Sequence, residues 1–419
     1  VRRMGPGALY LLATVPLSAF LFALTQTQRV FDTAITQSAS WVPQLGLDLI
    51  FRMDVLSWLM TLIVGGVGAL VLVYSAKYFP ADSSGLGRFT ALFLGFAGAM
   101  LGVVLADQTM TFYTFWELTS VLSYLLIGFH HGRRPARGAA RQAFLVTGFS
   151  ALAMFGGLVM VGQSPGGSYR FSTLVPALQS GELDPRSPIV IVAAVLILLG
   201  AFGKSAQAPF HFWLSGAMAA PTPVSAYLHA AAMVKAGIYL IARMTPGATL
   251  VPGWSALAVA FGLTTMILGA YRAMKQRDLK LVLAYGTVSQ LGMMTAVIGL
   301  GSASAMAAGI VILIAHSLFK SSLFLTVGAV ESSTGTRDLW ELSGLARKLP
   351  ALAIFAALAS LSMAGIPLTA GYLGKEGAIA ALYSGTEAAW LSGSPGLEKL
   401  FLAILAMGSA LSVAYTWRM

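Results

Sequence analysis

Long apolar runs, repeated along almost the whole chain, limit what this sequence can fold into more than any other feature. A helix needs about 20 apolar residues to cross the hydrocarbon of a bilayer, and twelve runs approach or exceed that length. Backbone polar groups inside a bilayer must bond one another, and helices do this within one segment. We therefore expect an all-α polytopic membrane protein with about 12 transmembrane segments. The runs cover residues 8–24, 54–76, 89–106, 109–129, 140–162, 188–220, 223–243, 254–271, 281–300, 304–330, 350–391 and 399–417.

Basic residues gather in alternate loops between these runs. Loops on the cytoplasmic side of membrane proteins carry an excess of Lys and Arg. With the N-terminus inside, sixteen basic residues lie inside and six outside. The net charge of +11 therefore follows from membrane topology and gives no reason to expect a nucleic-acid partner. The inner set is Arg2, Arg3, Lys77, Arg88, Arg133, Arg134, Arg137, Arg141, Arg272, Lys275, Arg277, Lys280, Arg337, Arg347, Lys348 and Arg418, and the outer set is Arg29, Arg52, Arg170, Arg186, Arg243 and Lys399.

Between the runs, residues 25–53 and 163–187 are rich in polar residues, Pro and Gly, and are expected to be outer surface loops. The chain has no cysteine, which excludes disulfides, thiolate metal sites and ligands for an iron–sulfur cluster. No cofactor and no metal site are expected, because the histidines form no close cluster with carboxylates. The chain begins Val-Arg-Arg and ends inside an apolar run, so we expect a fragment truncated at both ends.

Four lysines fall inside the apolar runs: Lys204, Lys235, Lys320 and Lys375. A charged side chain in hydrocarbon costs at least about 2.5 to 3.5 kcal/mol, so such a lysine indicates a functional site. Pro209 interrupts the run that holds Lys204 and must kink or open the helix. Open backbone at membrane depth is typical of ion sites in transporters. The alternative is a simple proline kink with lysines that reach the interface.

A second broken segment, in residues 350–391, holds Lys375 and Glu376 after Pro367 and a run of glycines. It follows the first by about five segments, so a second copy would enter the membrane from the opposite side, as in inverted repeats. We expect N-terminal helices and an outer loop in 1–88, and two inverted five-helix repeats in 89–243 and 254–419, each with a broken, lysine-bearing helix. Coincidence between two helices rich in Gly and Pro is the alternative.

Two further ionisable groups can join these lysines. Glu117 lies mid-helix with no local cation, so it pairs with a lysine of another helix, Lys204 being the best candidate, or it is a protonated structural group. His316 and Lys320 lie four residues apart and share one helical face. Histidine exchanges protons near neutral pH, so this spacing favours a proton hand-off over a structural histidine.

His229 and Lys235 are six residues apart, which is about 240° around a continuous helix. They do not share a face, but can flank one hydrated interior. His211, just after Pro209, is either functional or a cap of the half-helix.

At these residues the sequence resembles a known family. The segments FWELTSVLSYLLIGF, GKSAQAPFHFWLSGAMAAPTPVSAYLHAAAMVKAGIYLIARM, RDLKLVLAYGTVSQLGMM, HSLFKSSLFLTVGAVESSTGTRD and LSMAGIPLTAGYLGKEG are similar to the proton-translocating membrane subunits of respiratory complex I and of Mrp-type cation/proton antiporters. WELTSVLS, HAAAMVKAG, STGTRD and LGKEG are more like the A subunit of Mrp complexes. The resemblance implies a proton pathway through Glu117, Lys204, His229, Lys235, His316, Lys320 and Lys375, and less firmly His211 and Glu376.

The resemblance also implies a function. We expect a subunit of a Na⁺ or K⁺/proton antiporter, a transporter rather than an enzyme, working with other Mrp subunits in a prokaryotic plasma membrane. One alternative is a redox-driven proton-pumping subunit of complex I or a related hydrogenase. Another is a subunit that couples ion flow to inorganic carbon uptake. Family members usually have a helix before Leu9, and the A subunits of Mrp complexes continue far beyond Met419, which agrees with a fragment.

Overall fold

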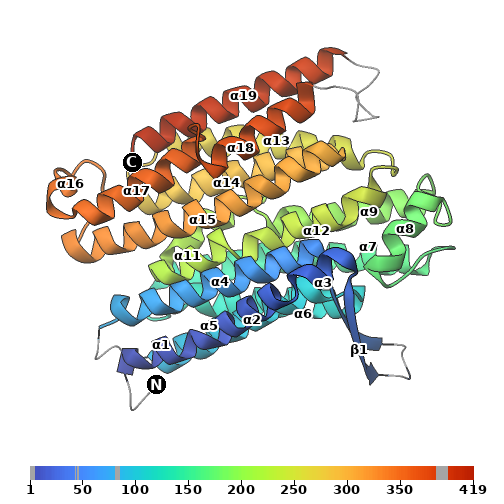
Figure 1. The fold of residues 1–419 in the computed structure, drawn as a ribbon, viewed down its shortest axis with the longest axis horizontal. Coiled ribbons are helices and arrows are strands. Elements are labelled where there is room, and N and C mark those ends of the chain that lie inside the picture. Colours follow the sequence, from blue (N-terminus) through green and yellow to red (C-terminus); the bar gives the residue numbers. More distant parts are fainter. Residues whose placement is uncertain (1–4, 43, 45–46, 81–84, 384–394) are drawn as a thin grey trace.

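The computed structural model describes residues 5–42, 44, 47–80, 85–383 and 395–419, and most of these residues are helical. The long helices lie side by side along one common direction, with the chain reversing at two ends (Figure 1). The N-terminal half contains η1 Gly5–Gly7, α1 Ala8–Leu12, α2 Thr14–Thr25, α3 Thr27–Asp32, α4 Val55–Tyr78, α5 Leu86–Leu105, α6 Thr109–Ile127 and α7 Arg134–Gln163. The C-terminal half contains α13 Trp254–Met274, α14 Leu279–Gly299, α15 Ala303–Thr334, α16 Leu345–Lys348 and α19 Pro395–Trp417.

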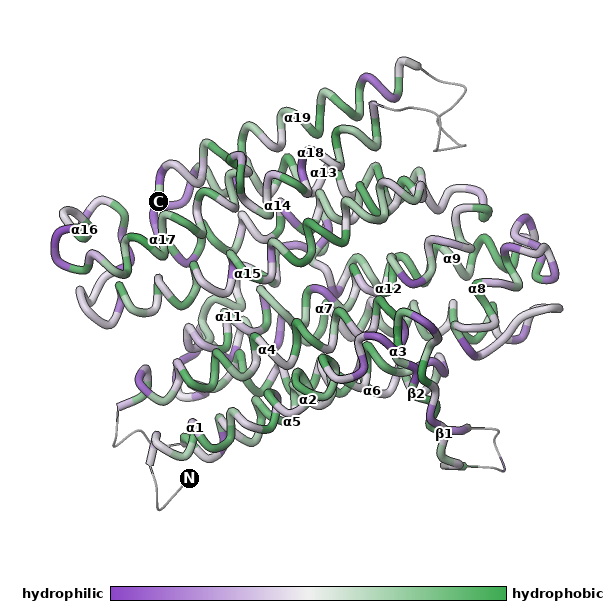
Figure 2. Tube along the Cα trace, viewed as in Figure 1, coloured by the Kyte–Doolittle hydropathy of each residue, from purple (hydrophilic) through white to green (hydrophobic). Residues whose placement is uncertain are grey.

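The helices have the length and composition of membrane spans. Within the described residues, nine are long and apolar enough to cross a bilayer, and two shorter apolar helices precede breaks, α9 Pro188–Lys204 and α17 Pro350–Ala364. Apolar residues dominate along the helices, and hydrophilic ones collect at the two ends (Figure 2). The polytopic helical class is confirmed, whereas twelve crossings, inverted repeats and the domain boundaries stay predictions. Arg2, Arg3 and residues 384–391 of one expected run lie outside the described residues.

Both outer loops contain secondary structure that we did not expect. Within 25–53, β1 Ile35–Val42 pairs antiparallel with β2 Leu47–Met53, so the described chain is not purely α-helical. Within 163–187, the residues form α8 Phe171–Ser180, which packs on α12 Met233–Ala248. Phe171, Leu174 and Leu178 are buried, and this i, i+3, i+7 spacing is an apolar stripe in a helix too short to stand out by hydropathy.

The run 223–243, expected to be continuous, is two helices, α11 Thr222–Ala230 and α12 Met233–Ala248. At the break, the N–H of Ala232 bonds the carbonyl of Tyr227, five residues back, and the N–H of Lys235 bonds the carbonyl of Ala232, three residues back. A wide turn followed by a tight one resets the helical phase. No Pro or Gly marks this position, so packing against neighbouring helices decides it.

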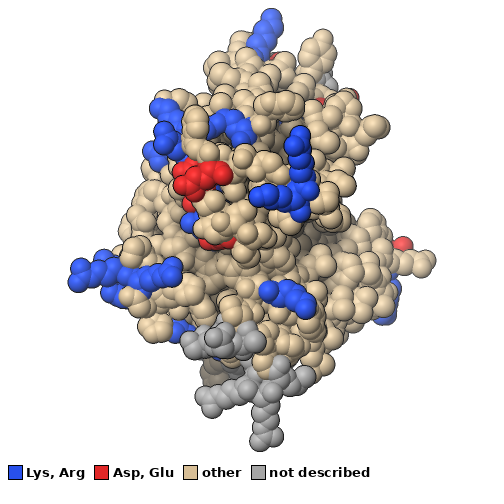
Figure 3. Space-filling view, turned by 90° about the vertical axis from the view of Figure 1, so that its left-hand side faces the viewer, with Lys and Arg blue, Asp and Glu red and all other residues tan. Residues whose placement is uncertain are grey.

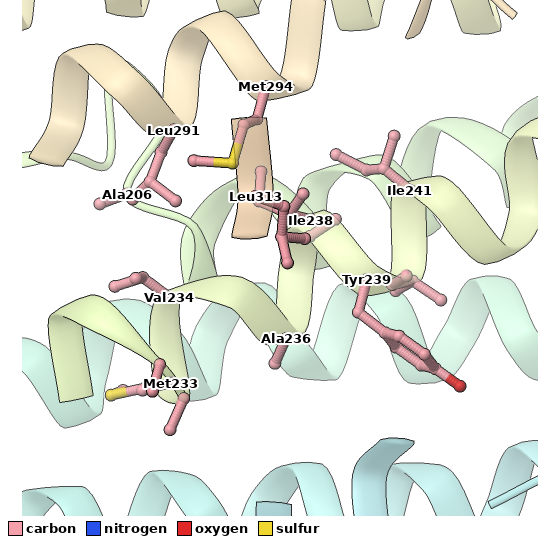
Figure 4. Packing of buried hydrophobic residues seen from close by; sticks show 14 of the residues in the cluster. Ala206, Met233, Val234, Ala236, Ile238, Tyr239, Ile241, Leu291, Met294 and Leu313 are labelled. Atoms are coloured by element: carbon pink, nitrogen blue, oxygen red, sulfur yellow. The ribbon is translucent and has the colours of Figure 1, made fainter. Parts of the chain in front are cut away.

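Helix α12 lies in the middle of the molecule, enclosed by other helices. Its Ile238 packs beneath Met294 of α14 and Leu313 of α15, while Tyr239 points to the opposite side (Figure 4). Ile238, Tyr239 and Ile241 are fully buried. A helix that is buried all round needs a mostly apolar surface, and any charge on it must find a partner inside the protein.

Both predicted helix breaks are confirmed. In the first, α9 ends at Lys204 and α10 Phe212–Gly216 follows. In the second, α17 ends at Ala364 and α18 Ala370–Tyr383 follows. Each break holds a non-glycine residue with positive φ, Ala206 at 50° and Leu368 at 73°, the two such residues in the described chain. This conformation is strained for residues with a side chain and occurs where surrounding structure imposes it.

Glycines bring the backbones of α13 and α14 into direct contact. A Cβ added to Gly262 would lie 2.5 Å from the Ala296 nitrogen, and one added to Gly292 would lie 2.5 Å from the Gly262 oxygen. No larger residue fits at these positions without separating the helices. We call this contact the glycine seam.

Basic side chains cluster at the end of the molecule that carries α16 and the C-terminus, with few acidic ones among them (Figure 3). Arg337 pairs with Asp278 at 3.2 Å, and Arg418 donates to the Gln276 carbonyl at 3.2 Å, so separate inner loops meet at this end. This grouping agrees with the charge count that assigns this end to the cytoplasm.

Single cysteines in this naturally cysteine-free chain should report the orientation. We expect an impermeant maleimide to label Ser180→Cys in intact cells, because α8 lies at the outer end. Gly132→Cys, with no atom within 4 Å of its added Cβ, should react only after permeabilisation. Both residues are exposed, so accessibility to solvent is matched. The opposite labelling pattern would show that the orientation in the membrane is the reverse of the expected one.

Candidate functional site

Lys204, the last residue of α9, contacts α6. Its Nζ donates to the Trp116 carbonyl at 3.0 Å and to Ser120 Oγ at 2.7 Å, and lies 5.1 Å from the Trp116 ring centre. The expected direct ion pair with Glu117 is not present: among the described residues, no ion pair within 4.0 Å joins these two groups. Trp116 and Ser120 share one face of α6, and Glu117 lies about 100° further round.

Glu117 nevertheless lies close to Lys204, because the lysine bonds the carbonyl of the preceding residue. Glu117 is half-buried, and its Oε1 is buried without a hydrogen-bond partner among the described residues. A buried acceptor without a partner is costly, so a change of side-chain rotamer toward Lys204 would gain a charge-assisted bond. The structure thus brings the two groups together without joining them.

The side chain of Lys235 reaches from α12 to α15. Its Nζ donates to the Leu313 carbonyl at 3.2 Å and makes a short contact with Ser317 Oγ. Its angular relation to His229 is not the expected 240°, because the break at residues 231–232 lies between them. His229 lies in the last turn of α11, is fully buried, and its ring centre lies 6.0 Å from that of Phe324 on α15. Both groups therefore face α15.

His316 and Lys320 are buried together on α15, as their spacing predicts. Lys320 Nζ donates to the Leu283 carbonyl of α14 at 3.0 Å. Both ring nitrogens of His316, like those of His229, have no hydrogen-bond partner in the described part of the chain. An imidazole nitrogen that is not engaged in a structural bond is free to accept or donate a proton.

Lys375 lies beside the second break. Its Nζ donates to the carbonyls of Met363 and Ala364 at 3.0 and 2.8 Å and to Ser412 Oγ at 2.5 Å. The two carbonyls belong to the last turn of α17, which the break leaves without helical partners. Glu376 is exposed and outside this group, whereas His211 is 7% exposed and lies at the start of α10.

All four lysines share one pattern of contacts. Each donates to a backbone carbonyl of another helix or of the break beside it, and none lies within 4.0 Å of a carboxylate among the described residues. Carbonyl and hydroxyl dipoles stabilise an ammonium less than a carboxylate does. The helices that carry them are α9, α12, α15 and α18, and α9 packs on α12 while α15 packs on α18.

Lys280 is a further buried lysine that the sequence did not reveal. The charge count places it among inner surface charges, but it is 2% exposed and donates to the carbonyls of Met218 and Ala220 at 3.0 and 2.6 Å. In sequence it resembles its exposed neighbour Lys275, and no signal separates the two. At the same end, Asp278, Glu331 and Arg337 line a polar cavity of about 390 Å³, which gives water access to this end of α14 and α15.

A second unpredicted group joins α4 and α12 at the other end. Arg243 donates to both carboxylate oxygens of Asp54, one in a short contact and the other at 3.1 Å, and to the Tyr239 hydroxyl at 2.7 Å. Asp54 also caps α4 in a capping box with Ser57. The charge count places Arg243 among outer surface charges, and the structure corrects this. In the described residues, no group of three His, Asp or Glu side chains could hold a metal ion.

Comparison with known families shows which family the chain belongs to. Residues 106–394 match the family described as NADH:quinone oxidoreductase/Mrp antiporter, transmembrane, and residues 41–90 match the N-terminus of complex I chain 5. The chain belongs to the NADH:quinone oxidoreductase/Mrp antiporter family. Helices α6 to α18, with all the predicted pathway residues, fall within the longer match.

Similar proteins include components of antiporters. A protein of Rhizobium meliloti described as the probable A/B component of a K⁺/H⁺ antiporter is 47% identical over 80% of this chain and 33% of its own length. The A1 component of a Na⁺/H⁺ antiporter of Staphylococcus aureus is 40% identical over 96% of this chain and 51% of its own. A chain of the Mrp complex from Dietzia sp. DQ12-45-1b superposes with a TM-score of 0.89 at 39% identity, over 100% of this chain and 44% of that one. The chain thus spans a third to a half of the length of these three proteins.

Proposed function

We propose that this chain carries protons as part of a multisubunit antiporter that exchanges a monovalent cation, Na⁺ or K⁺, for H⁺ across a prokaryotic plasma membrane. The observation that carries the proposal is the row of buried lysines at Lys204, Lys235, Lys320 and Lys375, each bonded to carbonyls rather than to a carboxylate. Among the residues that the structure describes, no carboxylate holds the charge of these lysines in place, which suits them to passing a proton on.

The contacts suggest the order of the relay. Glu117 and Lys204 form its first pair, Lys235 connects α12 to α15, and His316 and Lys320 continue it to α14. Lys375 ends it at the second break, and His229 lies beside the central step. His211 is buried but bonded to none of these groups, and exposed Glu376 stands outside the row. We assign neither of them a step.

Partners belong to the proposal. The similar chain of known structure is part of an Mrp complex, and the two curated relatives are named as parts of antiporters, which supports action within a hetero-oligomeric membrane complex and a transporter rather than a catalytic role. A redox-driven proton pump is the second candidate, because the family description also includes NADH:quinone oxidoreductases.

The test is cation-induced pH change in inverted vesicles that hold the complete complex. We expect Na⁺ or K⁺ to dissipate an imposed pH gradient without NADH or quinone, and a strict requirement for these redox partners would favour the second candidate. Glu117→Ala and Lys204→Ala should lower the rate of exchange by about 100-fold or more, as expected when a proton-transfer group is removed. Glu117→Asp should retain part of the activity, because the charge is kept.

The matched control is Glu182→Ala, which removes an exposed carboxylate at the outer end. It should assemble and exchange at the native rate. If Glu117→Ala assembled normally and also exchanged at the native rate, Glu117 would be a structural residue and the first step of the relay would be wrong.

A further inference from the structure

Lys320 differs from the other three lysines in its partners. Lys204, Lys235 and Lys375 each contact a serine hydroxyl, from Ser120, Ser317 and Ser412, as well as a carbonyl. For Lys320, the hydrogen-bond acceptor in the described part of the chain is the Leu283 carbonyl alone. A carbonyl accepts a hydrogen bond but cannot pass a proton on, whereas a hydroxyl both accepts and donates.

A hydroxyl-bearing side chain lies next to Lys320 all the same. A Cβ added to Gly286 on α14 would lie 2.9 Å from Lys320 Nζ and 3.0 Å from Cε2 of Tyr415. The amine nitrogen and Cε2 of the ring therefore both lie beside this glycine and within about 6 Å of each other. A side chain at position 286 would clash with both of them.

Tyr415 is held in place by polar neighbours on α14. The ring is fully buried, and the phenol oxygen accepts a hydrogen bond from Gln290 Nε2 at 3.4 Å. Ser289 is a second polar neighbour of the same hydroxyl. Because the oxygen is the acceptor in the Gln290 bond, the hydroxyl can still donate its own proton. Buried tyrosines normally have a hydrogen-bond partner for the hydroxyl, and Lys320 lies nearby.

Helix α19 carries a second hydroxyl toward the next lysine. Ser412 lies three residues before Tyr415, which places both on one face of the helix, about 5 to 6 Å apart between Cβ atoms. Ser412 Oγ accepts from Lys375 Nζ at 2.5 Å and donates to the Ser409 carbonyl at 2.7 Å. One face of α19 thus meets Lys320 with Tyr415 and Lys375 with Ser412.

We propose that Tyr415 and Ser412 of α19 carry the proton between Lys320 and Lys375. The Lys320 ammonium gives a proton to the Tyr415 oxygen as the Tyr415 hydroxyl releases its own, through water, toward Ser412. Ser412 takes up this proton, turns its hydroxyl away from the Ser409 carbonyl, and gives its own proton to the neutral amine of Lys375. Each hydroxyl gains one proton and loses one, so both remain neutral. This inference rests on the proposed proton-carrying function and adds residues to it.

The test is Tyr415→Phe in the complete complex, assayed in vesicles as above. Phenylalanine keeps the ring and its packing and removes only the hydroxyl. We expect normal assembly and a loss of exchange of roughly 100-fold, the lower range for a positioned proton-transfer group. The control is Tyr227→Phe: this ring is equally buried, but its hydroxyl donates to the Val64 carbonyl at 3.1 Å, away from the lysines. It should exchange at the native rate.

A second variant covers the case in which Tyr415→Phe fails to assemble. A fluorinated tyrosine at position 415 keeps ring and hydroxyl but makes the phenol more acidic, so the pH profile of exchange should shift, which a purely structural role would not cause. Native exchange by Tyr415→Phe, or an unchanged profile for the fluorinated variant, would overturn the link through α19. Lys320→Ala separates the two levels: if it is inactive while Tyr415→Phe is native, only the link is wrong, and if it too is native, the proposed function fails.

Discussion

Replacing Lys235 by alanine or by arginine is expected to abolish proton-coupled exchange. Lys235 is the residue that connects α12 to α15, through Leu313 and Ser317, and alanine removes the amine at this step. Arginine keeps the positive charge but does not release a proton at physiological pH, so it separates proton transfer from charge. We expect both variants to lower the rate of exchange by about 100-fold or more, measured as cation-induced pH change in vesicles with the complex intact.

Lys275→Arg is the matched control, because Lys275 lies outside the buried row, at the end of α13 that the charge count assigns to the cytoplasm. It should exchange like the native complex. Native rates in Lys235→Arg would mean that a fixed positive charge suffices at this position, and the relay would then have to bypass α12.

The second large effect is expected on stability, from Asp54→Ala. Arg243 would remain mostly buried with its guanidinium bonded to the Tyr239 hydroxyl alone, since both carboxylate contacts come from Asp54. Removing one partner of a buried pair costs about 3 kcal/mol or more. Thermal unfolding of the purified complex should show a lower Tm and a smaller assembled fraction. Arg52→Ala, which removes a partner 4.0 Å from Asp54, should cost less than about 1 kcal/mol.

The same pair predicts a dependence on pH. Burial by itself would raise the pKa of Asp54, but the charge and hydrogen bonds of Arg243 and the bonds from Ser57 outweigh it, and the pKa is lowered. A lowered pKa stabilises the fold above the unfolded value of about 3.9, and this contribution is lost as pH falls through the folded value. The difference in stability between Asp54→Ala and the native complex should therefore become smaller in strong acid. If this difference does not change with pH, the loss of stability comes from the lost helix cap.

The sequence predicted the features that depend on hydropathy and on local breakers. Pro209 and the glycines around Lys375 marked the two breaks, and the four lysines stood out because charge is rare in apolar runs. Lys280 and Arg243 were missed because each lies at the end of a run, where sequence cannot separate a surface charge from a buried one. The break at Ala231 was missed because an alanine run carries no breaker, and only tertiary packing determines it.

The direction in which side chains point also could not be predicted from the sequence. Glu117 was expected to bond Lys204, but a one-residue difference on α6 turns Trp116 and Ser120 toward the lysine instead. Helix periodicity fixes relative directions within α6 but not its rotation about its own axis, which depends on its neighbours. The same holds for Tyr415: the sequence does not show that it lies near Lys320, whereas the structure places both residues beside Gly286.

The glycine seam has a mechanical consequence for the lysine row. Helices whose backbones touch cannot slide without first separating, so α13 and α14 move as one stiff body. Lys320 is anchored to that body through the Leu283 carbonyl, whereas Lys375 is suspended from the two carbonyls at the end of α17. A movement of the broken segment would therefore change the distance between Lys320 and Lys375 without requiring α13 and α14 to move. The glycine seam is thus the rigid part of this half of the molecule, and the break beside Lys375 is the place where the chain can bend.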